Sequence, residues 1–440
     1  MKVKILMLLA VLYTTAGFAQ ARKLTLQEAI ELAVKNSGQL QGAQAKIEEA
    51  TAALREAVER KLPDVNASGS YLRLSHANVD LKTKSNNSSG GTQQQGSPEI
   101  SQVVYGMLNA SLPIYAGGKI KYGIEAAQYL EHAARLDAQS QRPEIELNAI
   151  NAYINLYKAG AVVALVKENL QTMQQRVKDL SNMEQNGLLA RNDLMKAQLQ
   201  ESNIELSVLD AENNWKLANV TTNLLLGLPE TTILEVDSTN ITPVTNQLQT
   251  LESFEQSALQ NRKELEALTY RTKAAGVGVR SAAAEKLPSV ALTGGYVAAD
   301  IPGFVTVTNA VNIGVGVQYS LSSLWKNKSK VEQAKSRQKQ LEISQNLLSD
   351  NIRLQVNRNY ENYILSQKKI DVYKKAIDQA AENYRIVKNK FDNSLATTTD
   401  VLDADVALLQ ARINYSNAKA DAVLAYNQLL QSAGMLSNTK

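Results

Sequence analysis

The stretch KLPDV at Lys61–Val65 recurs as KLPSV at Lys286–Val290. Each copy follows a long, Ala-rich pattern of helical periodicity and precedes an alternating pattern that is typical of a strand. Proline has no backbone N–H to donate within a helix, and it disfavours the α conformation in the residue before it. Each copy therefore predicts a point at which helix gives way to extended chain.

The two copies belong to a longer internal repeat with an offset of 286 − 61 = 225 residues. At this offset six residues match without a gap: Ala33, Asn36, Leu40, Val65, Gly69 and Tyr71 coincide with Ala258, Asn261, Leu265, Val290, Gly294 and Tyr296. We interpret the chain as a duplication. A first structural repeat over residues 22–227 and a second over 252–434 flank an equatorial linker over 228–251, and a C-terminal tail over 435–440 follows.

Residues 1–21 have the features of a secretory signal peptide. Lys2 and Lys4 precede an apolar core at Ile5–Tyr13, and Ala19–Ala21 is the expected cleavage site. The apolar core is too short to stay in a bilayer as a spanning helix. We find no later apolar run of about 18 residues, so we expect an exported protein and not a helical inner-membrane protein.

Composition narrows the class further. The chain has no Cys, which excludes disulfides, thiolate metal sites and a lipid on an N-terminal Cys. The formal net charge of +4 is not gathered in a basic stripe, so nucleic acid is not expected as a partner. Ala, Gln, Asn, Leu and Lys dominate, as in proteins built from long helices.

Catalysis is not expected either. His76 and His132 lie in unrelated sequence contexts, and the glycines at Gly294-Gly295 fall within a strand pattern and not before a helix, where a phosphate-binding loop would lie. We therefore expect no enzyme activity, no cofactor and no metal site.

The helical periodicity predicts helices of very unequal length. Two segments of about 68 residues would each extend about 100 Å along their axes, and shorter ones precede or follow them. The predicted helices are Thr25–Arg60, Gly118–Gln185, Asn192–Leu226, Glu252–Glu285, Lys326–Asn393 and Thr399–Ser432. Thr25 and Glu28 form the expected capping box of the first, Pro143 is expected to kink or break the second, and Asn192–Leu226 is expected to stack end to end with Glu252–Glu285.

Alternation of apolar and polar residues predicts four strands, grouped as two hairpins. They are Val65–Tyr71, Val104–Leu112, Val290–Tyr296 and Val311–Leu321. A long polar loop over Ala77–Gln102 joins the first pair, and the second pair turns at Ile301–Gly303. Strands of this length with one apolar face suit a transmembrane β-barrel. The alternative is a pair of soluble hairpins packed on helices.

Four strands in lipid cannot close a barrel, because an open edge leaves backbone groups unpaired. Two chains would supply eight strands and three would supply twelve, and a lumen wide enough for solutes favours three. The predicted fold is a mixed α and β membrane protein with a long antiparallel coiled-coil α-barrel. Its four transmembrane strands per chain would close a 12-stranded barrel as a trimer.

Three motifs resemble those of the TolC-like outer-membrane efflux protein family. Asn186–Leu194 and Thr399–Ala404 are similar to its two helical-hairpin tips, and Ser111–Gly118 is similar to its strand-to-helix junction. The resemblance extends to Ser432–Gly434 and thus covers the mature chain. It implies a homotrimer in outer-membrane lipid with a periplasmic extension. It also implies a passive exit duct of a tripartite efflux or type I secretion system, fed by an inner-membrane transporter through a periplasmic membrane-fusion adaptor.

The same resemblance assigns a periplasmic aperture to Asp400 and Asp403. These residues are one helical turn apart and match the acidic rings that narrow the entrance in the family. Three chains would bring six carboxylates together there. The alternative is that Asp400 merely favours the N-terminus of its helix, as acids do.

A gate latch of the family is only partly present. Phe391 stands where a Tyr hydroxyl would bond Asp193 of the neighbouring hairpin, and Ala396 stands where an Arg would be its ionic partner. We expect Asp193 to use Arg191 or Lys390 instead, or the closed state to depend on packing.

The predicted tips carry a repeated exposed leucine. Gly187-Leu188 and Ser394-Leu395 interrupt the helices at equivalent positions, since 395 − 188 = 207, the offset that relates the helical hairpins. Three chains would present six such tips, which we interpret as adaptor-docking sites.

Two other kinds of protein use long coiled coils. A periplasmic adaptor generally has one helical hairpin flanked by small β-domains, whereas this chain has two hairpins in tandem and membrane-type strands. A structural rod would leave the strands and the signal peptide unexplained.

Overall fold

The computed structural model describes residues 22–77, 100–237, 241 and 248–436. The predicted signal peptide and most of the loop predicted over Ala77–Gln102 lie outside these residues. The chain divides into two compact units, which are described separately. The described parts of the helical unit are 22–45, 136–237, 241, 248–266 and 346–436, and those of the sheet unit are 46–77, 100–135 and 267–345.

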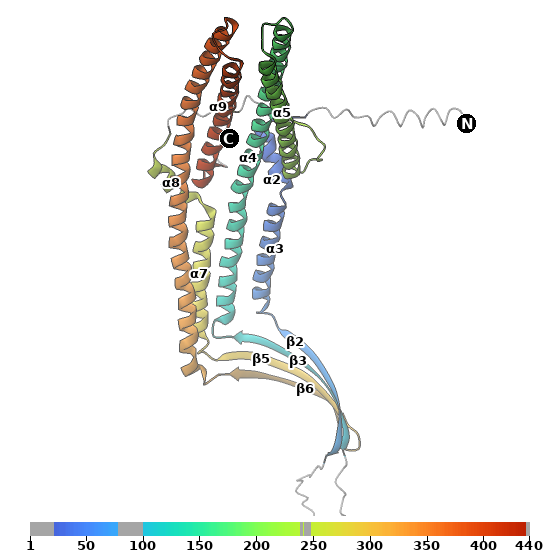
Figure 1. Ribbon diagram of the computed structural model, residues 1–440. Helices are drawn as coiled ribbons and strands as arrows, with labels where there is room; N and C mark the ends of the chain where they lie inside the picture. Colours follow the sequence, from blue (N-terminus) through green and yellow to red (C-terminus); the bar gives the residue numbers. More distant parts are fainter. Residues whose placement is uncertain (1–21, 78–99, 238–240, 242–247, 437–440) are drawn as a thin grey trace, which may run out of the picture. The chain divides into compact units, whose positions relative to one another are not determined.

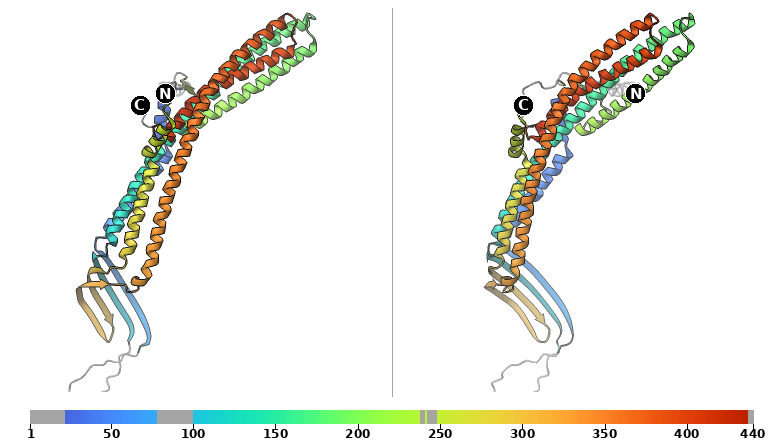
Figure 2. Two further views of the ribbon diagram at one scale, coloured as in Figure 1. Left: turned by 90° about the vertical axis from the view of Figure 1, so that its left-hand side faces the viewer. Right: turned by 60° about the vertical axis from the view of Figure 1, so that its left-hand side comes forward.

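The sheet unit contains one antiparallel sheet of four long strands, in the order β2-β3-β5-β6. The strands are β2 (Asp64–Ala77), β3 (Ile100–Tyr115), β5 (Ser289–Ile301) and β6 (Val305–Gln318). They lie side by side in every view (Figures 1 and 2). Two hairpins, one from each sequence repeat, are joined through β3 and β5.

The strand register separates an apolar face from a polar face. One row across the four strands is apolar: Ala67, Leu108, Tyr296 and Val311. The adjacent row is polar or small: Asn66, Asn109, Gly295 and Asn312. Because side chains alternate between faces along a strand, this register gives the sheet one face suited to lipid and one suited to water.

The four strands are confirmed, but their predicted ends are wrong. The first hairpin is longer, since Ala77 and Ile100–Gln102, predicted as loop, pair in strands. The last strand is displaced toward the turn, since β6 begins at Val305 and not at Val311 and ends at Gln318 and not at Leu321. The turn at Gly303, where φ is +75°, is as predicted. The ends of a strand depend on which residues find a partner across the sheet. The alternation of residues within one strand does not reveal that pairing.

Two very long helices contribute to both units. They are α4 (Lys119–Gln185), with 67 residues, and α8 (Ser323–Asp392), with 70 residues. Both agree with the predicted spans. Pro143 lies inside α4, which continues through it, so the predicted break does not occur.

The predicted helices Thr25–Arg60 and Glu252–Glu285 are each two helices. The first divides into α2 (Leu26–Asn36) and α3 (Gly38–Glu59), and the second into α6 (Leu251–Asn261) and α7 (Lys263–Ala284). Ser37 and Arg262 at the breaks have extended backbones with ψ of 114° and 115°. The breaks are equivalent, because 262 − 37 = 225. Thr25 caps α2 as predicted, its Oγ1 accepting from the Glu28 N–H at 3.2 Å.

A returning helix ends against each break. The helix α5 (Arg191–Leu226) stops at Gly227, and α9 (Thr398–Ser432) is followed by Gly434; both glycines have φ of +67°. A Cβ on Gly227 would lie 2.8 Å from the side chain of Asn36, whose Nδ2 donates to the Leu226 carbonyl at 2.6 Å.

Gly434 has the same position in the second repeat. A Cβ on Gly434 would lie 2.9 Å from the Cβ of Asn261. Asn192–Leu226 was predicted to stack with Glu252–Glu285. The predicted stacking is wrong. The end of α5 meets α2, from the first repeat, and it is α9 whose end meets α6.

A short parallel pair was not predicted. Strand β1 (Arg22–Leu24) pairs with β4 (Leu234–Val236), and Leu24 and Leu234 are fully or almost fully buried. Strands of three residues carry too little alternation to be recognised in the sequence.

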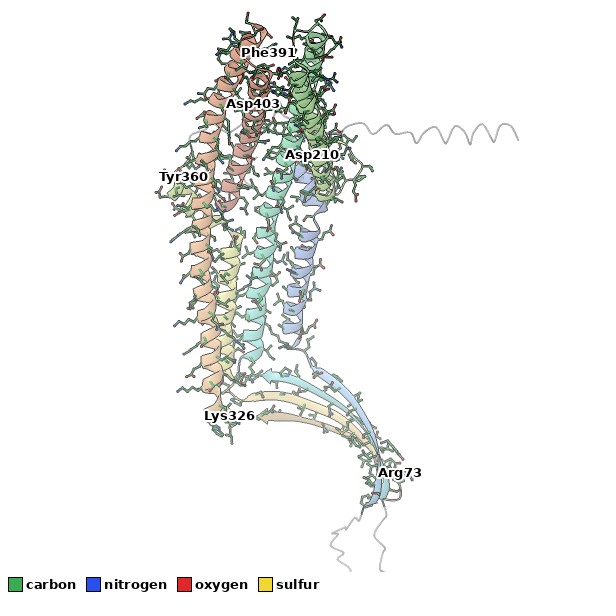
Figure 3. The ribbon with its side chains drawn as sticks, viewed as in Figure 1. Arg73, Asp210, Lys326, Tyr360, Phe391 and Asp403 are labelled. Atoms are coloured by element: carbon green, nitrogen blue, oxygen red, sulfur yellow. The ribbon has the colours of Figure 1, made fainter. Side chains whose placement is uncertain are left out.

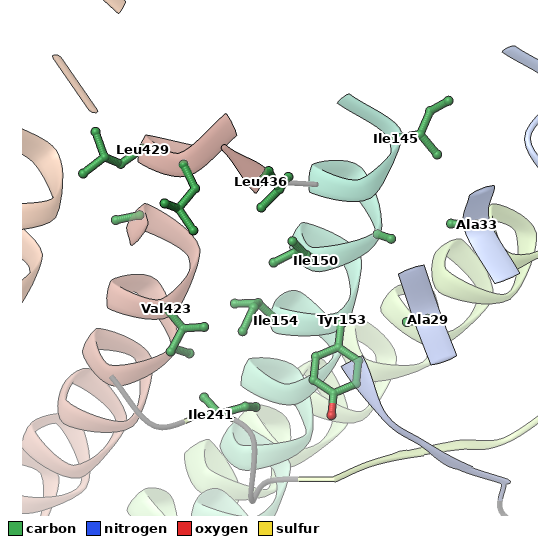
Figure 4. Packing of buried hydrophobic residues seen from close by; sticks show 14 of the residues in the cluster. Ala29, Ala33, Ile145, Ile150, Tyr153, Ile154, Ile241, Val423, Leu429 and Leu436 are labelled. Atoms are coloured by element: carbon green, nitrogen blue, oxygen red, sulfur yellow. The ribbon is translucent and has the colours of Figure 1, made fainter. Parts of the chain in front are cut away.

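The main core of the helical unit lies where α2, α4, α6 and α9 meet. Figure 4 shows Ile150 and Ile154 of α4 among Val423 of α9 and other apolar side chains. Tyr153 is completely buried, and its hydroxyl donates to the Asp237 carbonyl at 2.8 Å. Burial raises the pKa of Tyr153 to about 12.

The prediction that no long apolar run follows the signal peptide is wrong for one helix, α4. By length and composition alone, α4 contains one stretch apolar enough to cross a membrane, about a third of it buried. Many residues of α4 from Ile145 to Leu156 belong to the main core. Packing in this core therefore accounts for part of the apolar character of the stretch, of which about a third is buried.

Candidate functional site: the helical hairpin tips

The first tip, between α4 and α5, is a compact C-cap. Gly187 has φ of +74°, and its N–H donates to the Glu184 carbonyl at 2.9 Å. The Leu188 N–H donates to the Met183 carbonyl at 2.8 Å. This pair of bonds is the Schellman motif, which satisfies carbonyls at the end of α4 and turns the chain sharply.

The second tip, between α8 and α9, repeats the motif 207 residues later. Ser394 occupies the left-handed position with φ of +60°, and its N–H donates to the Phe391 carbonyl at 2.9 Å. The Leu395 N–H donates to the Lys390 carbonyl at 2.7 Å. The two tips are therefore equivalent in hydrogen bonding as well as in sequence.

Both tips present a leucine to solvent. Leu188 and Leu395 are 74% and 76% exposed, more than any other leucine in the described part of the chain. In a Schellman motif the residue at this position commonly packs back on its helix. Here neither does, so each tip carries an isolated apolar side chain.

A second apolar cluster holds the hairpins together beneath the tips. Its buried members come from α4, α5 and α9: Val166, Met173, Leu180, Leu194, Ala197, Ile204, Val208 and Leu402. Phe391, labelled near the end of α8 in Figure 3, packs against this cluster. The residue that stands in place of the latch tyrosine is thus a packing residue in this chain.

Asp400 is part of the N-terminal cap of α9. Its Oδ2 accepts from the Thr397 N–H at 2.8 Å and from the Thr397 hydroxyl at 2.7 Å. In return, the Asp400 N–H donates to the Thr397 hydroxyl at 3.2 Å. The pKa of Asp400 is lowered chiefly by the bond from the Thr397 N–H. The bond from the Thr397 hydroxyl and the positive charge of Lys390 lower it further. The capping role that we set beside the aperture role is therefore present in the single chain.

Asp403 is in a different position, one turn further along α9 (Figure 3). It is exposed and makes no hydrogen bond or ion pair with the residues that the structure describes. Its neighbours Val401, Leu402 and Ala404 are buried. Asp403 consequently points away from the hairpin core, with its carboxylate available.

Asp193 has a partner that was not predicted from the sequence. Its Oδ1 lies 3.2 Å from Nζ of Lys196, three residues along α5. Arg191 is an exposed residue at the start of α5, and Lys390 acts on Asp400 and not on Asp193. Within one chain Asp193 thus pairs with Lys196. The use of Arg191 or Lys390 in the closed state, or a closed state that depends on packing, stays a prediction. Ala396 is half-buried in the turn after Leu395.

A polar contact between the two hairpins was not predicted from the sequence. Arg176 of α4 donates from Nη2 to the hydroxyl of Tyr384 of α8, and its guanidinium lies 5.5 Å from the centre of that ring. Its Nη1 is buried without a hydrogen-bond partner. A basic residue beside the apolar heptad position Val177 was the available signal.

Arg176 borders a cavity of about 510 Å³ that separates α4 from α8 and α9. Phe391, Thr398 and Val401 line the same cavity. Nearby, the buried carboxylate of Asp405 accepts from Nδ2 of Asn169 at 2.9 Å. Polar contacts and open space thus lie between the hairpins at the level of Arg176, where continuous apolar packing would otherwise fix them.

A family model described as "Outer membrane efflux protein" matches residues 29–228 and 255–435. The chain belongs to the outer membrane efflux protein family. It is therefore an outer-membrane efflux channel protein and not an enzyme. The family assignment agrees with the resemblance noted in the sequence, and the predicted fold class is confirmed.

Individual relatives are distant in sequence and alike in fold. Outer membrane efflux protein BepC of Brucella suis biovar 1 (strain 1330) is 24% identical over 426 residues, covering 93% of this chain and 91% of that protein. The outer membrane protein VceC of Vibrio cholerae has a TM-score of 0.74 at 21% identity, covering 93% of this chain and 96% of that one. The CmeC outer membrane channel of Campylobacter jejuni has a TM-score of 0.73 at 18% identity, covering 93% and 86%.

Proposed function

We propose that three copies of this chain form a passive exit duct of a tripartite efflux or secretion system. Substrates would be delivered by an inner-membrane transporter through a periplasmic adaptor. The observation that carries the trimer is the four-stranded sheet, which has one apolar face and two free edges.

The edges of the sheet belong to β2 and β6, each paired on one side only among the described residues. In lipid, the outward-facing backbone N–H and C=O groups of an edge strand have neither a strand partner nor water, so an open edge is not stable. Pairing β6 of one copy with β2 of the next removes all edges. Three copies give 3 × 4 = 12 strands, with the polar row of Asn66, Asn109 and Asn312 lining the lumen.

The helical unit has an uncovered apolar stripe on α5. Its members are 58–65% exposed and are spaced by about whole helical turns, so they share one face: Met195, Leu199, Leu206, Leu209, Leu217 and Leu224. Large exposed apolar surfaces of this kind mark sites of association.

A second apolar stripe runs along the part of α8 in the helical unit. Its members are 40–68% exposed: Leu347, Leu354, Leu365, Val372 and Ile386. Two stripes on different helices of one chain suit a head-to-tail contact, in which α5 of one copy packs on α8 of the next. Such heterologous contacts form a ring when the rotation between neighbouring copies closes, as it does in a barrel of three copies.

The topology supports a helical extension on one side of the membrane. The ends of the strands that join helices are neighbours in the register, since Asp64 pairs with Ser111 and Ser289 pairs with Gln318. The four helices that join these strands, α3, α4, α7 and α8, thus leave the sheet at the same end of the strands. Export by the predicted signal peptide would place them in the periplasm.

The tips are the proposed docking sites for the adaptor. Leu188 and Leu395 are exposed at equivalent turns, and three chains would present six of them. The acidic aperture would be formed by Asp403, with Asp400 contributing in addition to its cap.

The proposal is tested by producing the protein in cells whose own outer-membrane efflux channels have been deleted, together with its adaptor and transporter. We expect heat-modifiable trimers in the outer-membrane fraction and restored export. A soluble monomer in the periplasm would contradict the proposal.

A further inference from the structure

The four points where strands meet helices share one chemistry. Each carries an exposed apolar or aromatic residue close to lysines. We name these residues the junction collar: Lys61, Leu62, Ile114, Tyr115, Lys119, Lys121, Lys286, Leu287, Tyr319, Leu321, Leu324, Trp325, Lys326 and Lys328. All of them belong to the sheet unit.

The aromatic members continue the apolar face of the sheet. Tyr115 pairs with Val290, which pairs with Val317, and Tyr319 follows Val317 at the alternating spacing. Trp325 lies in the first turn of α8 and is 66% exposed. Tyrosine and tryptophan are enriched where an apolar membrane surface meets water, because their rings are apolar and their tips are polar.

Most lysines of the collar have no acidic partner. The nearby acids Glu125 and Glu285 are occupied by Arg280 and Lys330, each at 2.5 Å. Five of the collar lysines make no ion pair with a described residue: Lys61, Lys119, Lys121, Lys286 and Lys326. Lys328, which is 84% exposed, makes only a long ion pair, with 4.0 Å between its Nζ and Oε1 of Glu332.

Two acids at the same level, Glu59 and Asp64, make no ion pair with a described basic residue either. Because five unpaired lysines outnumber these two acids, the collar carries an excess of unpaired positive charge.

The junction between β3 and α4 also contains a groove of about 750 Å³. Ile114, Tyr115 and Ile120 supply apolar wall, and Lys61 and Lys121 line the same space. Glu125 lines it as well, but its carboxylate is paired with Arg280. An apolar wall beside two lysines matches a molecule that joins an acyl chain to a negative phosphate.

The described residues at the other end of the sheet lack this pattern. Arg73 and Lys326 lie at opposite ends of the sheet in Figure 3. Among the described residues of the far end, Arg73 is accompanied by an acid, Asp300. In the part of the sheet unit that the structure describes, unpaired positive charge is thus concentrated at the end that joins the helices.

From these observations we infer that the junction collar binds anionic phospholipid headgroups of the periplasmic leaflet. The apolar and aromatic side chains would sit at the acyl boundary while the lysines extend to the phosphates. The inference rests on the proposed trimeric barrel, because only a barrel in the membrane places the collar at a lipid surface. The collar would then fix the depth of the barrel in the bilayer.

Trp325 provides a direct probe. The chain has only two tryptophans, so Trp215→Phe leaves Trp325 as the single tryptophan, which is excited selectively over the tyrosines. Trimers of this variant are reconstituted in vesicles that contain a fixed fraction of lipid brominated near the headgroup. The brominated lipid is either phosphatidylglycerol or phosphatidylcholine. We expect quenching in both cases, and about fivefold enrichment of the anionic lipid at low salt, since each lysine near a charged surface is worth about 1 kcal/mol.

Lys326→Gln with Lys328→Gln should abolish the preference for the anionic lipid and leave quenching by phosphatidylcholine. The matched control is Lys335→Gln with Lys339→Gln, the same change of charge further along α8, which should keep the preference. Channel conductance is recorded in the same vesicles. Conducting trimers with unquenched Trp325, or with equal quenching by both lipids, would overturn the collar and leave the channel intact. Absence of conducting trimers would instead contradict the proposed function.

Discussion

At the scale of single residues, the two aspartates of the proposed aperture differ in what holds them. Asp400 accepts two bonds from Thr397, whereas Asp403 is exposed and makes no bond with the described residues. The aperture and capping hypotheses for Asp400 are therefore compatible, and variants can separate them.

Asp403→Ala should lower cation selectivity and multivalent block in single-channel recordings without loosening the start of α9. Asp400→Ala should do both, because it also removes the cap of the Thr397 N–H. The double variant should have the largest effect on selectivity. Unchanged selectivity in the double variant would leave Asp400 as a helix cap and remove the ring from this account.

The cap should also depend on pH. The pKa of Asp400 is lowered in the folded state, so its contribution is present above its ordinary value of 3.8 and is lost as the pH falls through the folded value. Hydrogen exchange at the start of α9, corrected for intrinsic rates, should accelerate in that acidic range in the parent chain. Asp400→Ala should show fast exchange at every pH. A parent chain whose protection does not change with pH would contradict the capping role.

Asp193 leads to a prediction about the gate. Its bond to Lys196 is an ion pair between partly exposed residues of one helix, which is worth only about 0.3–0.5 kcal/mol. A better partner across the hairpins should displace it. Phe391→Tyr with Ala396→Arg should therefore lower the resting conductance. If the conductance stays unchanged while the trimer is intact, Asp193 is not part of a latch.

At the scale of elements, much of the fold follows from the sequence. Proline at residues 63 and 288 marks both helix-to-strand transitions, and the two repeat offsets identify both hairpins. The breaks at Ser37 and Arg262 were not predictable, because each depends on a helix end that arrives from about 200 residues away.

The candidate site was predictable in part for the same reason. The turns at the tips follow from local motifs and from the position of Gly187. The pairing of Asp193 with Lys196 depends on which rotamers the folded helix favours, and the contact of Arg176 with Tyr384 joins two helices. Neither leaves a periodic signal in the sequence.

The tips yield the second kind of prediction. Leu188→Asp with Leu395→Asp should abolish export and leave trimers in the outer membrane, since neither leucine packs on its own chain. The control is Asn186→Asp with Asn393→Asp, which adds the same charge at the neighbouring exposed positions and should retain export. Normal export by the leucine variant would refute docking at these residues.

At the scale of the whole molecule, the apolar stripes account for association. Leu199→Glu with Leu206→Glu places two carboxylates on the stripe of α5 that is proposed to face α8 of the next copy. Burying an unpaired charge costs several kcal/mol, so trimers should be lost in cross-linking and size measurements. The control, Ser207→Glu with Asn214→Glu, adds the same charge at exposed positions of the same helix outside the stripe. Equal loss in both variants would indicate a general effect on folding.

The central claim is that three copies of one chain complete the barrel and its helical extension. Native mass spectrometry of the protein extracted from the outer membrane tests it most directly. We predict a single assembly with the mass of three mature chains, which conducts when it is placed in a planar bilayer. A conducting assembly of one or two chains would contradict the account, because four or eight strands would then suffice for the channel.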